Sequence, residues 1–186
     1  MKIALYLGSF NPFHNGHLDV IGTAINEFKM DKVVIVPTMR DSLNIDKRIL
    51  IIIRSLYTSN CSFIPYTFDK DFEIGSNVII SNIEKELIPP YHSYATLHAL
   101  KNKYCNDKIF VLVGSDTMED IPNWMHGGKI IEDYDFLIVD KPRYSVSSSS
   151  IREMLRTRNK MSAYYSDEKL ARYVSPNVIE LLKKYY

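Results

Sequence analysis

The hydrophobic positions of this chain fall into two kinds of segment. Short, continuous apolar runs alternate with longer stretches in which apolar residues recur every three or four positions. A continuous apolar run is typical of a strand that is covered on both faces, as in a parallel sheet flanked by helices. By this pattern the predicted strands are residues 2–7, 32–36, 61–68, 108–113 and 135–139.

Helical spacing follows the first strand directly, where Leu18, Ile21, Ile25 and Phe28 form an approximate stripe. The predicted helices are residues 18–28, 47–57, 77–87, 94–104, 116–121, 129–131, 149–156 and 176–185. Because strands and helices alternate, we expect an α/β fold with a Rossmann-like, doubly wound parallel sheet of five or six strands. Ligands of such sheets bind at the carboxyl ends of the strands, near the point where the strand order reverses.

The composition is that of an ordinary globular protein. The chain has 186 residues, of which 46% are hydrophobic and 24% are charged, which is enough to build a full core. We expect a single domain over residues 1–186, with a C-terminal helical segment at about 147–186. With 23 basic against 22 acidic residues, the chain has no general attraction to nucleic acid or to an anionic membrane.

The expected location is the cytoplasm. No stretch of 18 apolar residues predicts a transmembrane helix, and the first residues lack the pattern of a signal peptide. Cys61 and Cys105 have no motif spacing and are interpreted as reduced thiols. The expected partners are therefore small molecules, with neither nucleic acid nor membrane among them, and a homo-oligomer is left open.

The most informative segment joins the first strand to the first helix, and it reads Gly8-Ser9-Phe10-Asn11-Pro12-Phe13-His14-Asn15-Gly16-His17. A strand-to-helix turn aims free backbone N–H groups and the positive end of the helix dipole at whatever lies above it. Gly16 lets the backbone come close to a ligand. His14 and His17 can donate N–H groups to phosphate oxygens, which only accept hydrogen bonds. The turn is therefore predicted to bind phosphate.

Two other interpretations of these histidines compete with phosphate binding. Two histidines three residues apart could bind a metal ion, but no third ligand stands at a standard spacing. Alternatively, His14 is a plain turn residue that caps the helix. Phosphate binding is favoured because glycine, histidine and helix start coincide. No metal site is predicted.

A second helix start carries the run Ser147-Ser148-Ser149-Ser150-Ile151-Arg152. Serine hydroxyls cap a helix start, and the N–H groups of the first turn remain free. Arg152 would oppose the helix dipole there unless an anion lies between them. Alone, this is an ordinary serine cap with a surface arginine. Together with the histidine turn, two helix N-termini can hold one polyphosphate.

Two further candidates follow the strand at residues 108–113. Asp116 stands where such folds place a carboxylate on a ribose hydroxyl, although it would also cap the next short helix. Trp124 is the only tryptophan. A lone tryptophan is usually core, but this one lies in a polar loop, which suits a stacking surface for an aromatic ring.

Two weaker features have structural default interpretations. Ser93-Tyr94-Ala95-Thr96 begins a predicted helix, so capping is the default. Lys47 and Arg48 begin another predicted helix, and a solvated helix face is the default, although they follow a strand end on the ligand side.

Together these motifs resemble those of the nucleotidyltransferase superfamily named for its histidine-x-glycine-histidine motif, and more closely those of the bacterial nicotinate-mononucleotide adenylyltransferases. The first motif matches G-x-F-[DN]-P-x-H-x-G-H-L. Gly114, Asp116 and Trp124 match G-x-D-x₇-W, and residues 146–152 match I-S-S-T-x-I-R. Trp124 and the segment that begins at Val174 point to the nicotinate branch.

The sequence departs from this resemblance at a few positions. Asn11 stands where aspartate is commoner, and Ser149 stands where threonine is commoner. The usual Pro-Pro-His-Lys stretch is missing, and the loop after the second strand reads Thr38-Met39-Arg40-Asp41-Ser42. These departures fall in motifs that the resemblance assigns to mononucleotide binding, whereas the motifs assigned to ATP binding match. Nicotinamide mononucleotide therefore remains open as an alternative acceptor.

The resemblance implies that ATP and nicotinate mononucleotide react to nicotinate adenine dinucleotide and pyrophosphate in NAD biosynthesis, with Mg²⁺ bound through the ATP phosphates rather than in a protein cage. It implies catalytic roles for His14, His17 and Arg152. The implied ATP-binding residues are Gly8, Ser9, Phe10, Gly16, Gly114, Asp116, Ser147, Ser148 and Ser149. The implied mononucleotide-binding residues are Trp124, Tyr94, Thr96 and Lys47.

Other functions remain as rivals. Phosphopantetheine adenylyltransferases share the first motif and the serine run, but they usually have threonine at the position of His14 and lysine at that of Arg152. Glycerol-3-phosphate cytidylyltransferases have shorter chains. A non-catalytic nucleotide sensor on the same scaffold would tolerate the loss of His14 or Arg152, and both are present.

Overall fold

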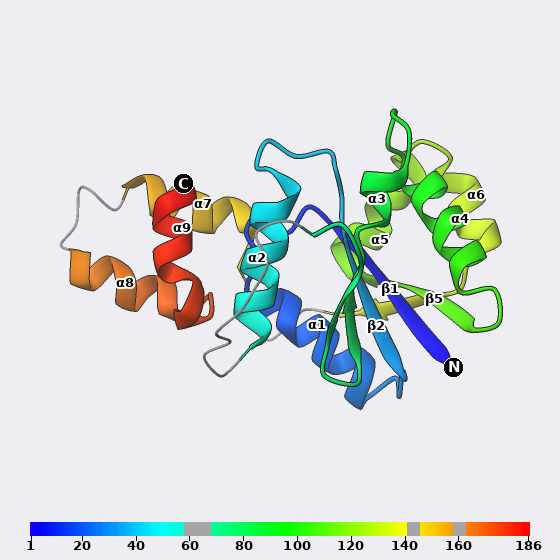
Figure 1. Cartoon of the computed structure of the whole chain (residues 1–186), viewed down its shortest axis with the longest axis horizontal. Coiled ribbons are helices and arrows are strands. Elements are labelled where there is room, and N and C mark those ends of the chain that lie inside the picture. The colour runs from blue at the N-terminus through cyan, green and yellow to red at the C-terminus, as the bar shows by residue number, and fades with distance from the viewer. Residues whose placement is uncertain (58–67, 141–145, 158–162) are drawn as a thin grey trace.

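The computed structural model describes residues 1–57, 68–140, 146–157 and 163–186, and within them one six-stranded sheet forms the centre (Figure 1). The strand order is β3-β4-β2-β1-β5-β6. The strands are β1 (Lys2–Gly8), β2 (Lys32–Pro37), β3 (Phe72–Ile74), β4 (Val78–Ile80), β5 (Lys108–Gly114) and β6 (Phe136–Val139). Five strands are parallel, and only the edge strand β3 is antiparallel to its neighbour. The predicted α/β class with a doubly wound sheet is confirmed.

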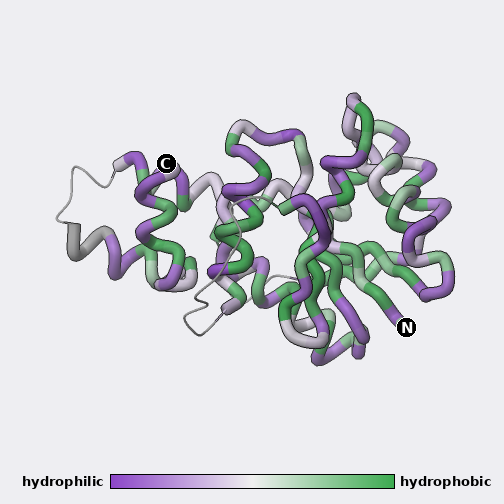
Figure 2. Tube along the Cα trace, in the orientation of Figure 1, coloured by the Kyte–Doolittle hydropathy of each residue, from purple (hydrophilic) through white to green (hydrophobic). Residues whose placement is uncertain are grey.

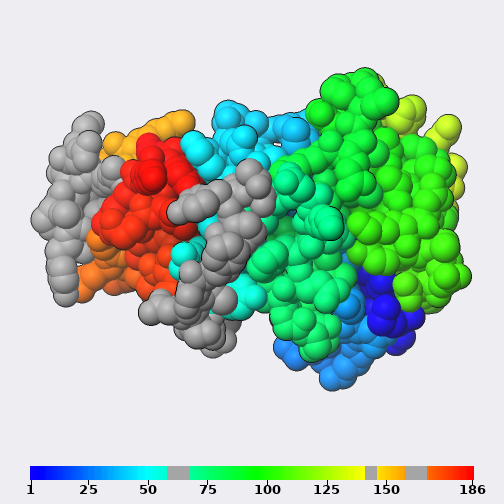
Figure 3. All heavy atoms as spheres, viewed as in Figure 1, coloured from blue at the N-terminus to red at the C-terminus, as the bar shows by residue number. Residues whose placement is uncertain are grey.

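Helices cover both faces of the sheet (Figure 1). On one face, α1 (Asn15–Asn26) and α2 (Ile45–Leu56) pack on the sheet, and α7 (Ser148–Thr157), α8 (Ala163–Ala171) and α9 (Ile179–Tyr185) extend the same core on the far side of α2. The other face is covered by α3 (Ile83–Glu86), α4 (Ser93–Lys103), α5 (Ser115–Asp120) and α6 (Gly127–Asp133). Two 3₁₀ turns, Ile121–Asn123 and Pro176–Val178, precede α6 and α9. In Figure 3 the orange and red C-terminal helices lie beside the cyan atoms of α2.

The burial pattern explains why the strands read as continuous apolar runs. Along β1, Ala4 and Tyr6 belong to the core under α1 and α2, whereas Ile3 and Leu5 belong to the core under α4 and α6. Successive side chains point to opposite faces, so a strand between two cores is apolar at every position. Figure 2 shows this as hydrophobic colour along the central strands.

Residues 77–87 were predicted as one helix, and this prediction is wrong. Val78–Ile80 form the short strand β4, paired with β2, and only Ile83–Glu86 are helical. A short apolar run does not distinguish a buried strand from a helix by periodicity alone. The hairpin partner β3 was not predicted, and Gly75 in the turn takes a positive φ of 59°. Helix α8 was not predicted either.

The strand predicted at residues 61–68 lies, except for Phe68, outside the described residues. The other predicted strands agree with β1, β2, β5 and β6 to within a residue or two. None of the helices in the described part of the chain has the length and apolar character needed to cross a membrane.

The strand order reverses beside β1. The chain steps from β1 to β2 and β4 in one direction, and then returns to place β5 and β6 on the other side of β1. A doubly wound sheet opens a crevice at such a point, at the carboxyl ends of the strands. This crevice lies where β1 and β5 end.

Candidate active site

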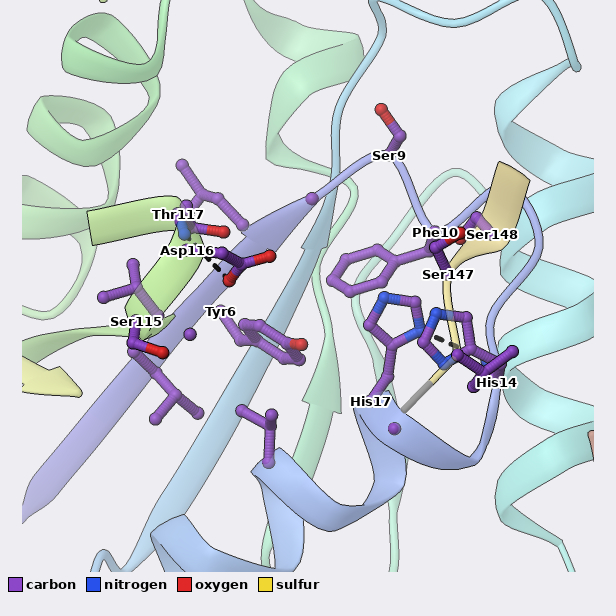
Figure 4. Close-up of a pocket in the computed structure, with 18 residues that line it drawn as sticks. Tyr6, Ser9, Phe10, His14, His17, Ser115, Asp116, Thr117, Ser147 and Ser148 are labelled. Atoms are coloured by element: carbon purple, nitrogen blue, oxygen red, sulfur yellow. Dashed lines mark hydrogen bonds between the residues drawn. The ribbon is translucent and has the colours of Figure 1, made fainter. Parts of the chain in front are cut away.

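A cavity of about 550 Å³ opens at the reversal of strand order. Its walls come from four segments: residues 6–10, residues 14–20, residues 112–117 and residues 146–148. Figure 4 shows His14 and His17 beside Ser147 and Ser148, with Asp116 across the cavity. The histidine turn and the serine-rich helix start, 130 positions apart in sequence, thus face one space, as the phosphate-binding hypothesis requires.

The two histidines are held against each other at the start of α1. His14 is the N-cap residue, and its backbone N–H donates to Nδ1 of His17 at 3.1 Å. The rings stack with centroids 3.7 Å apart. Because Nδ1 of His17 accepts this bond, the proton of the neutral imidazole is assigned to Nε2. His17 therefore presents one N–H donor.

Aromatic rings surround His17 and remove it from water. The rings of Phe10, Phe13 and Tyr6 lie with centroids 5.0, 5.1 and 6.1 Å from the His17 ring. Burial lowers the pKa of His17 well below its usual range, and His14 adds to this effect. Burial also lowers the pKa of His14 to about 4. Both imidazoles are therefore neutral at pH 7 and act as hydrogen-bonding groups rather than as cations.

The lowered pKa of His14 makes stability depend on pH. An unfolded chain binds this proton near pH 6.5, whereas the folded chain binds it only near pH 4. Stability is therefore lost as the pH falls below 6.5, and His14 alone should account for about 2 kcal/mol between pH 7 and pH 5. Urea unfolding at these two pH values measures the loss. His14→Asn should reduce it, and the exposed His98→Asn should not; an unchanged loss in His14→Asn would refute the assignment.

The N-terminus of α7 is fastened to the histidine turn. Ser147 caps the helix by accepting from the backbone N–H of Ser150 at 3.1 Å. The hydroxyl of Ser148 donates to the carbonyl of Pro12 at 2.9 Å, although 136 positions separate the two residues. This contact fixes the serine run beside the loop that leads into α1.

Arg152 makes a second connection between these segments. Its guanidinium donates to the carbonyl of Asn11 and, at 2.9 Å, to the hydroxyl of Ser149. Two of the five guanidinium N–H groups are engaged in this way. Arg152 was expected in the first turn of this helix, but α7 begins at Ser148, so Arg152 is its fifth residue and lies just beyond the first turn. Its guanidinium contacts the loop that leads to the histidines.

Asn11 joins the loop to two further parts of the chain. Its side-chain amide donates to the carboxylate of Asp41, and its side-chain oxygen accepts from the hydroxyl of Tyr186. An amide can donate and accept at once, whereas an ionised aspartate can only accept and would repel Asp41. Asparagine at position 11 can therefore bind both Asp41 and Tyr186, which an ionised aspartate could not do.

The opposite wall of the cavity carries Asp116. Its Oδ1 accepts from the backbone N–H of Thr117 at 2.8 Å, and the residue is exposed at the cavity rim. A Cβ built at Gly114 would lie 2.6 Å from the same oxygen. Gly114 therefore leaves the room that this carboxylate occupies. Tyr6, which sequence reasoning missed, lines the cavity between the two walls; its position two residues before Gly8 at the strand end was the available signal.

A second groove, of about 420 Å³, lies beside Trp124. The other residues that line it are Arg40, His92, Ser93, Asn123 and Met125. Trp124 is half-buried and rests on the core under α4 and α6. Arg40 was not predicted as a site residue. The signal for it was its place in the polar loop after β2, on the ligand side of the sheet.

Three predicted mononucleotide-binding residues do not line this groove. Thr96 is fully buried and donates to Glu84 at 2.7 Å. The hydroxyl of Tyr94 donates to Asp133 at 2.9 Å, and Tyr94 lines a different hollow. Lys47 lies over the ring of Tyr185, with Nζ 4.9 Å from the ring centroid.

Arg48 was predicted to lie on a solvated helix face, and the structure corrects this. The side chain is 1% exposed, and its guanidinium donates to the carbonyls of Leu43, Ser9 and Thr38 at 2.8, 2.6 and 2.7 Å. Burial lowers its pKa from the usual value, while the nearby carboxylate of Asp41 opposes the change. Arg48 therefore connects the loop after β1 with the loop after β2.

A doubly wound sheet with a crevice at the carboxyl ends of its strands, where two helix starts meet, is the architecture of a Rossmann-like α/β domain. The chain belongs to the Cytidylyltransferase-like family, whose model matches residues 5–154. The superfamily resemblance noted in the sequence is thereby confirmed. Within the described residues, no group of three or more histidine, cysteine, aspartate or glutamate side chains is placed to hold a metal ion.

Relatives and solved structures cover nearly the whole chain. The nicotinate-nucleotide adenylyltransferase of Bacillus subtilis is 25% identical over 95% of this chain and 96% of its own length. The fold also matches that of the Plasmodium falciparum nicotinic acid mononucleotide adenylyltransferase complexed with NaAD, with a TM-score of 0.70 and 19% identity over 99% of this chain and 95% of that one.

Proposed function

We propose that this protein is a nicotinate-nucleotide adenylyltransferase, which transfers the adenylyl group of ATP to nicotinate mononucleotide and releases pyrophosphate. The observation that carries the proposal is the contact of Ser148 with Pro12, because it brings the serine run and the histidine turn to one cavity. The similarity to an enzyme of this name over nearly the whole chain supports the choice of substrates.

The reaction needs little covalent chemistry from the protein. An oxygen of the mononucleotide phosphate attacks the α-phosphorus of ATP in line. The bond from this phosphorus to the bridging oxygen breaks, and pyrophosphate leaves with the electron pair. Because the attacking phosphate is already an anion, no general base is required. The protein contributes position and stabilises charge in the transition state.

The residues that line the cavity support the proposed ATP-binding roles. Nε2–H of His17, with His14 beside it, would donate to phosphate oxygens. The backbone N–H groups at the start of α7, in the run Ser147, Ser148 and Ser149, would bind the β- and γ-phosphates together with the unengaged N–H groups of Arg152. ATP would enter as its Mg²⁺ complex, with the ion held by phosphate oxygens. The backbone of Gly8, Ser9, Phe10 and Gly16 lines the same space.

The two ends of the reaction would be held at separate places. Asp116, beside Gly114, would accept from the adenosine ribose hydroxyls. Trp124 would stack on the pyridine ring of the acceptor in the second groove. Tyr94, Thr96 and Lys47 are not retained as ligand contacts, because their side chains engage other partners.

Pyrophosphate release from Mg-ATP tests the proposal. Nicotinate mononucleotide, nicotinamide mononucleotide and phosphopantetheine are supplied in turn as acceptors. We expect the highest kcat/KM with nicotinate mononucleotide and no turnover with phosphopantetheine. Turnover with phosphopantetheine alone would assign a sister activity, and ATP binding without pyrophosphate release from any acceptor would assign a nucleotide sensor.

Gly114→Ala tests the role of Asp116 without changing the carboxylate. The new methyl group must displace Asp116, because its Cβ would lie 2.6 Å from Oδ1. Loss of one charge-assisted hydrogen bond to the ribose should raise the KM for ATP roughly tenfold. Gly128→Ala is the control, since a Cβ there meets nothing within 4 Å. An unchanged KM for ATP in Gly114→Ala would remove Asp116 from the ATP site.

A further inference from the structure

The groove beside Trp124 is lined by the guanidinium group of Arg40. Nη2 of Arg40 donates to the hydroxyl of Ser93 at 3.1 Å. Within the described residues, no carboxylate oxygen forms an ion pair with Arg40 at 4.0 Å or less. A guanidinium has five N–H donors in a planar fork that matches a carboxylate. Most of the donors of Arg40 are therefore available to an anion that enters the groove.

A buried carboxylate holds the backbone that carries Arg40. The backbone N–H of Met39 donates to Oε2 of Glu84 at 2.6 Å, and the hydroxyl of Thr96 donates to Oε1 at 2.7 Å. Glu84 and Thr96 are both buried. The loop after β2 is thus tied to α4, which begins at Ser93. Arg40 is positioned at the groove by its own backbone neighbour and by Ser93.

The walls of the groove favour a flat ring that carries negative charge. Trp124 offers an aromatic surface, and Arg40 and His92 are the ionisable residues among those that line the groove. Neither of them can carry negative charge. An anionic substituent on a stacked ring would therefore meet a cation and, among the described lining residues, no repelling carboxylate.

We propose that Arg40 selects the acid over the amide form of the pyridine mononucleotide by pairing with the pyridine carboxylate. This inference rests on the proposed function. The two mononucleotides share phosphate, ribose and ring, and they differ only where a carboxylate replaces a carboxamide. A guanidinium–carboxylate bond is charge-assisted and about twice as strong as a bond between neutral groups. Arg40 also lies in the loop after β2, where the sequence departs from the family that it resembles.

Arg40→Gln tests this selection, because glutamine keeps a hydrogen-bonding group but removes the charge. Steady-state kinetics with each mononucleotide and Mg-ATP should show kcat/KM falling roughly 10- to 100-fold for nicotinate mononucleotide and by less than about threefold for nicotinamide mononucleotide. Arg40→Lys should keep part of the preference. Lys129→Gln is the control: this exposed cation on α6 lies near Tyr94 and does not line the groove.

Direct binding separates a failure of this inference from a failure of the proposed function. Calorimetric titration of the wild type and Arg40→Gln with each mononucleotide, in the presence of a non-hydrolysable ATP analogue, reports selection without turnover. Acid-selective binding that Arg40→Gln abolishes supports the role of Arg40, even if no pyrophosphate is released. Equal losses for both acceptors, or a wild type that binds both equally, would overturn it, because Arg40 would then act on a shared group or not at all.

Discussion

Replacing His17 with alanine should lower kcat for adenylyl transfer by roughly 10²- to 10³-fold, the usual effect of losing one group that stabilises charge in a transition state. His17 has one N–H donor, because its Nδ1 accepts from the backbone of His14. This donor belongs to a neutral, buried ring in a cavity at the carboxyl ends of β1 and β5. A fixed donor of this kind needs no reorganisation when charge develops.

Two further substitutions separate the two nitrogen atoms of this ring. In His17→Asn the side-chain oxygen can replace Nδ1 as the acceptor, but no donor remains at the position of Nε2. In His17→Gln a donor can reach that position, while the Nδ1 acceptor is lost. If the donor matters, His17→Asn should be as slow as His17→Ala, and His17→Gln should keep part of the activity.

Single-turnover kinetics with Mg-ATP and nicotinate mononucleotide give the rates, and thermal unfolding shows whether each variant is folded. His98→Ala is the control, since His98 is an exposed histidine on α4. A fully active His17→Asn enzyme would contradict the proposed role of Nε2–H.

Replacing Arg48 should have the largest effect on stability. Alanine would leave the carbonyls of Leu43, Ser9 and Thr38 without their donor, and it would open a cavity in a buried position. Unpaired buried polar groups and cavities both destabilise a folded protein. We therefore expect the free energy of unfolding to fall by about 3 kcal/mol or more. Since domains are stable by only about 5–15 kcal/mol, this is a large fraction of the total.

Arg48→Met distinguishes the lost hydrogen bonds from the lost volume. Methionine fills much of the space, so a variant that remains strongly destabilised would assign the loss to the carbonyls. Arg54→Ala is the control on the same helix, at a half-buried position. Urea unfolding gives the free energies. A change of less than about 1 kcal/mol in Arg48→Ala would mean that the two loops keep their positions without it.

The elements that were predicted well share a physical cause. A continuous apolar run and burial on both faces occur together in β1, β2 and β5. The local sequence pattern therefore suffices to predict these strands. Val78–Ile80 have the same apolar character, but three residues are too few for periodicity to separate strand from helix, and pairing with β2 decides the outcome. β3 depends likewise on a partner that the local pattern does not name.

The candidate ATP-binding residues could be predicted from the sequence because they lie in local motifs. Each helix start, at Asn15 and at Ser148, carries its candidate ligand-binding residues within a few positions. The residues of the candidate acceptor groove could not be predicted in this way. Arg40 is held at the groove by its hydrogen bond to Ser93, and buried Thr96 donates to Glu84. The positions of both side chains therefore depend on contacts between separate segments.

The local order of residues by itself determined the alternation of strands and helices, the prediction that two helix starts bind phosphate, and the family resemblance. These properties follow from periodicity and from chemistry within one turn of helix or one strand end. The tertiary structure alone decided that Ser148 meets Pro12, that Arg48 is buried and that Arg40 and Trp124 line the same groove. Such contacts join segments tens of residues apart, and only the packing of helices on both faces of one sheet brings them together.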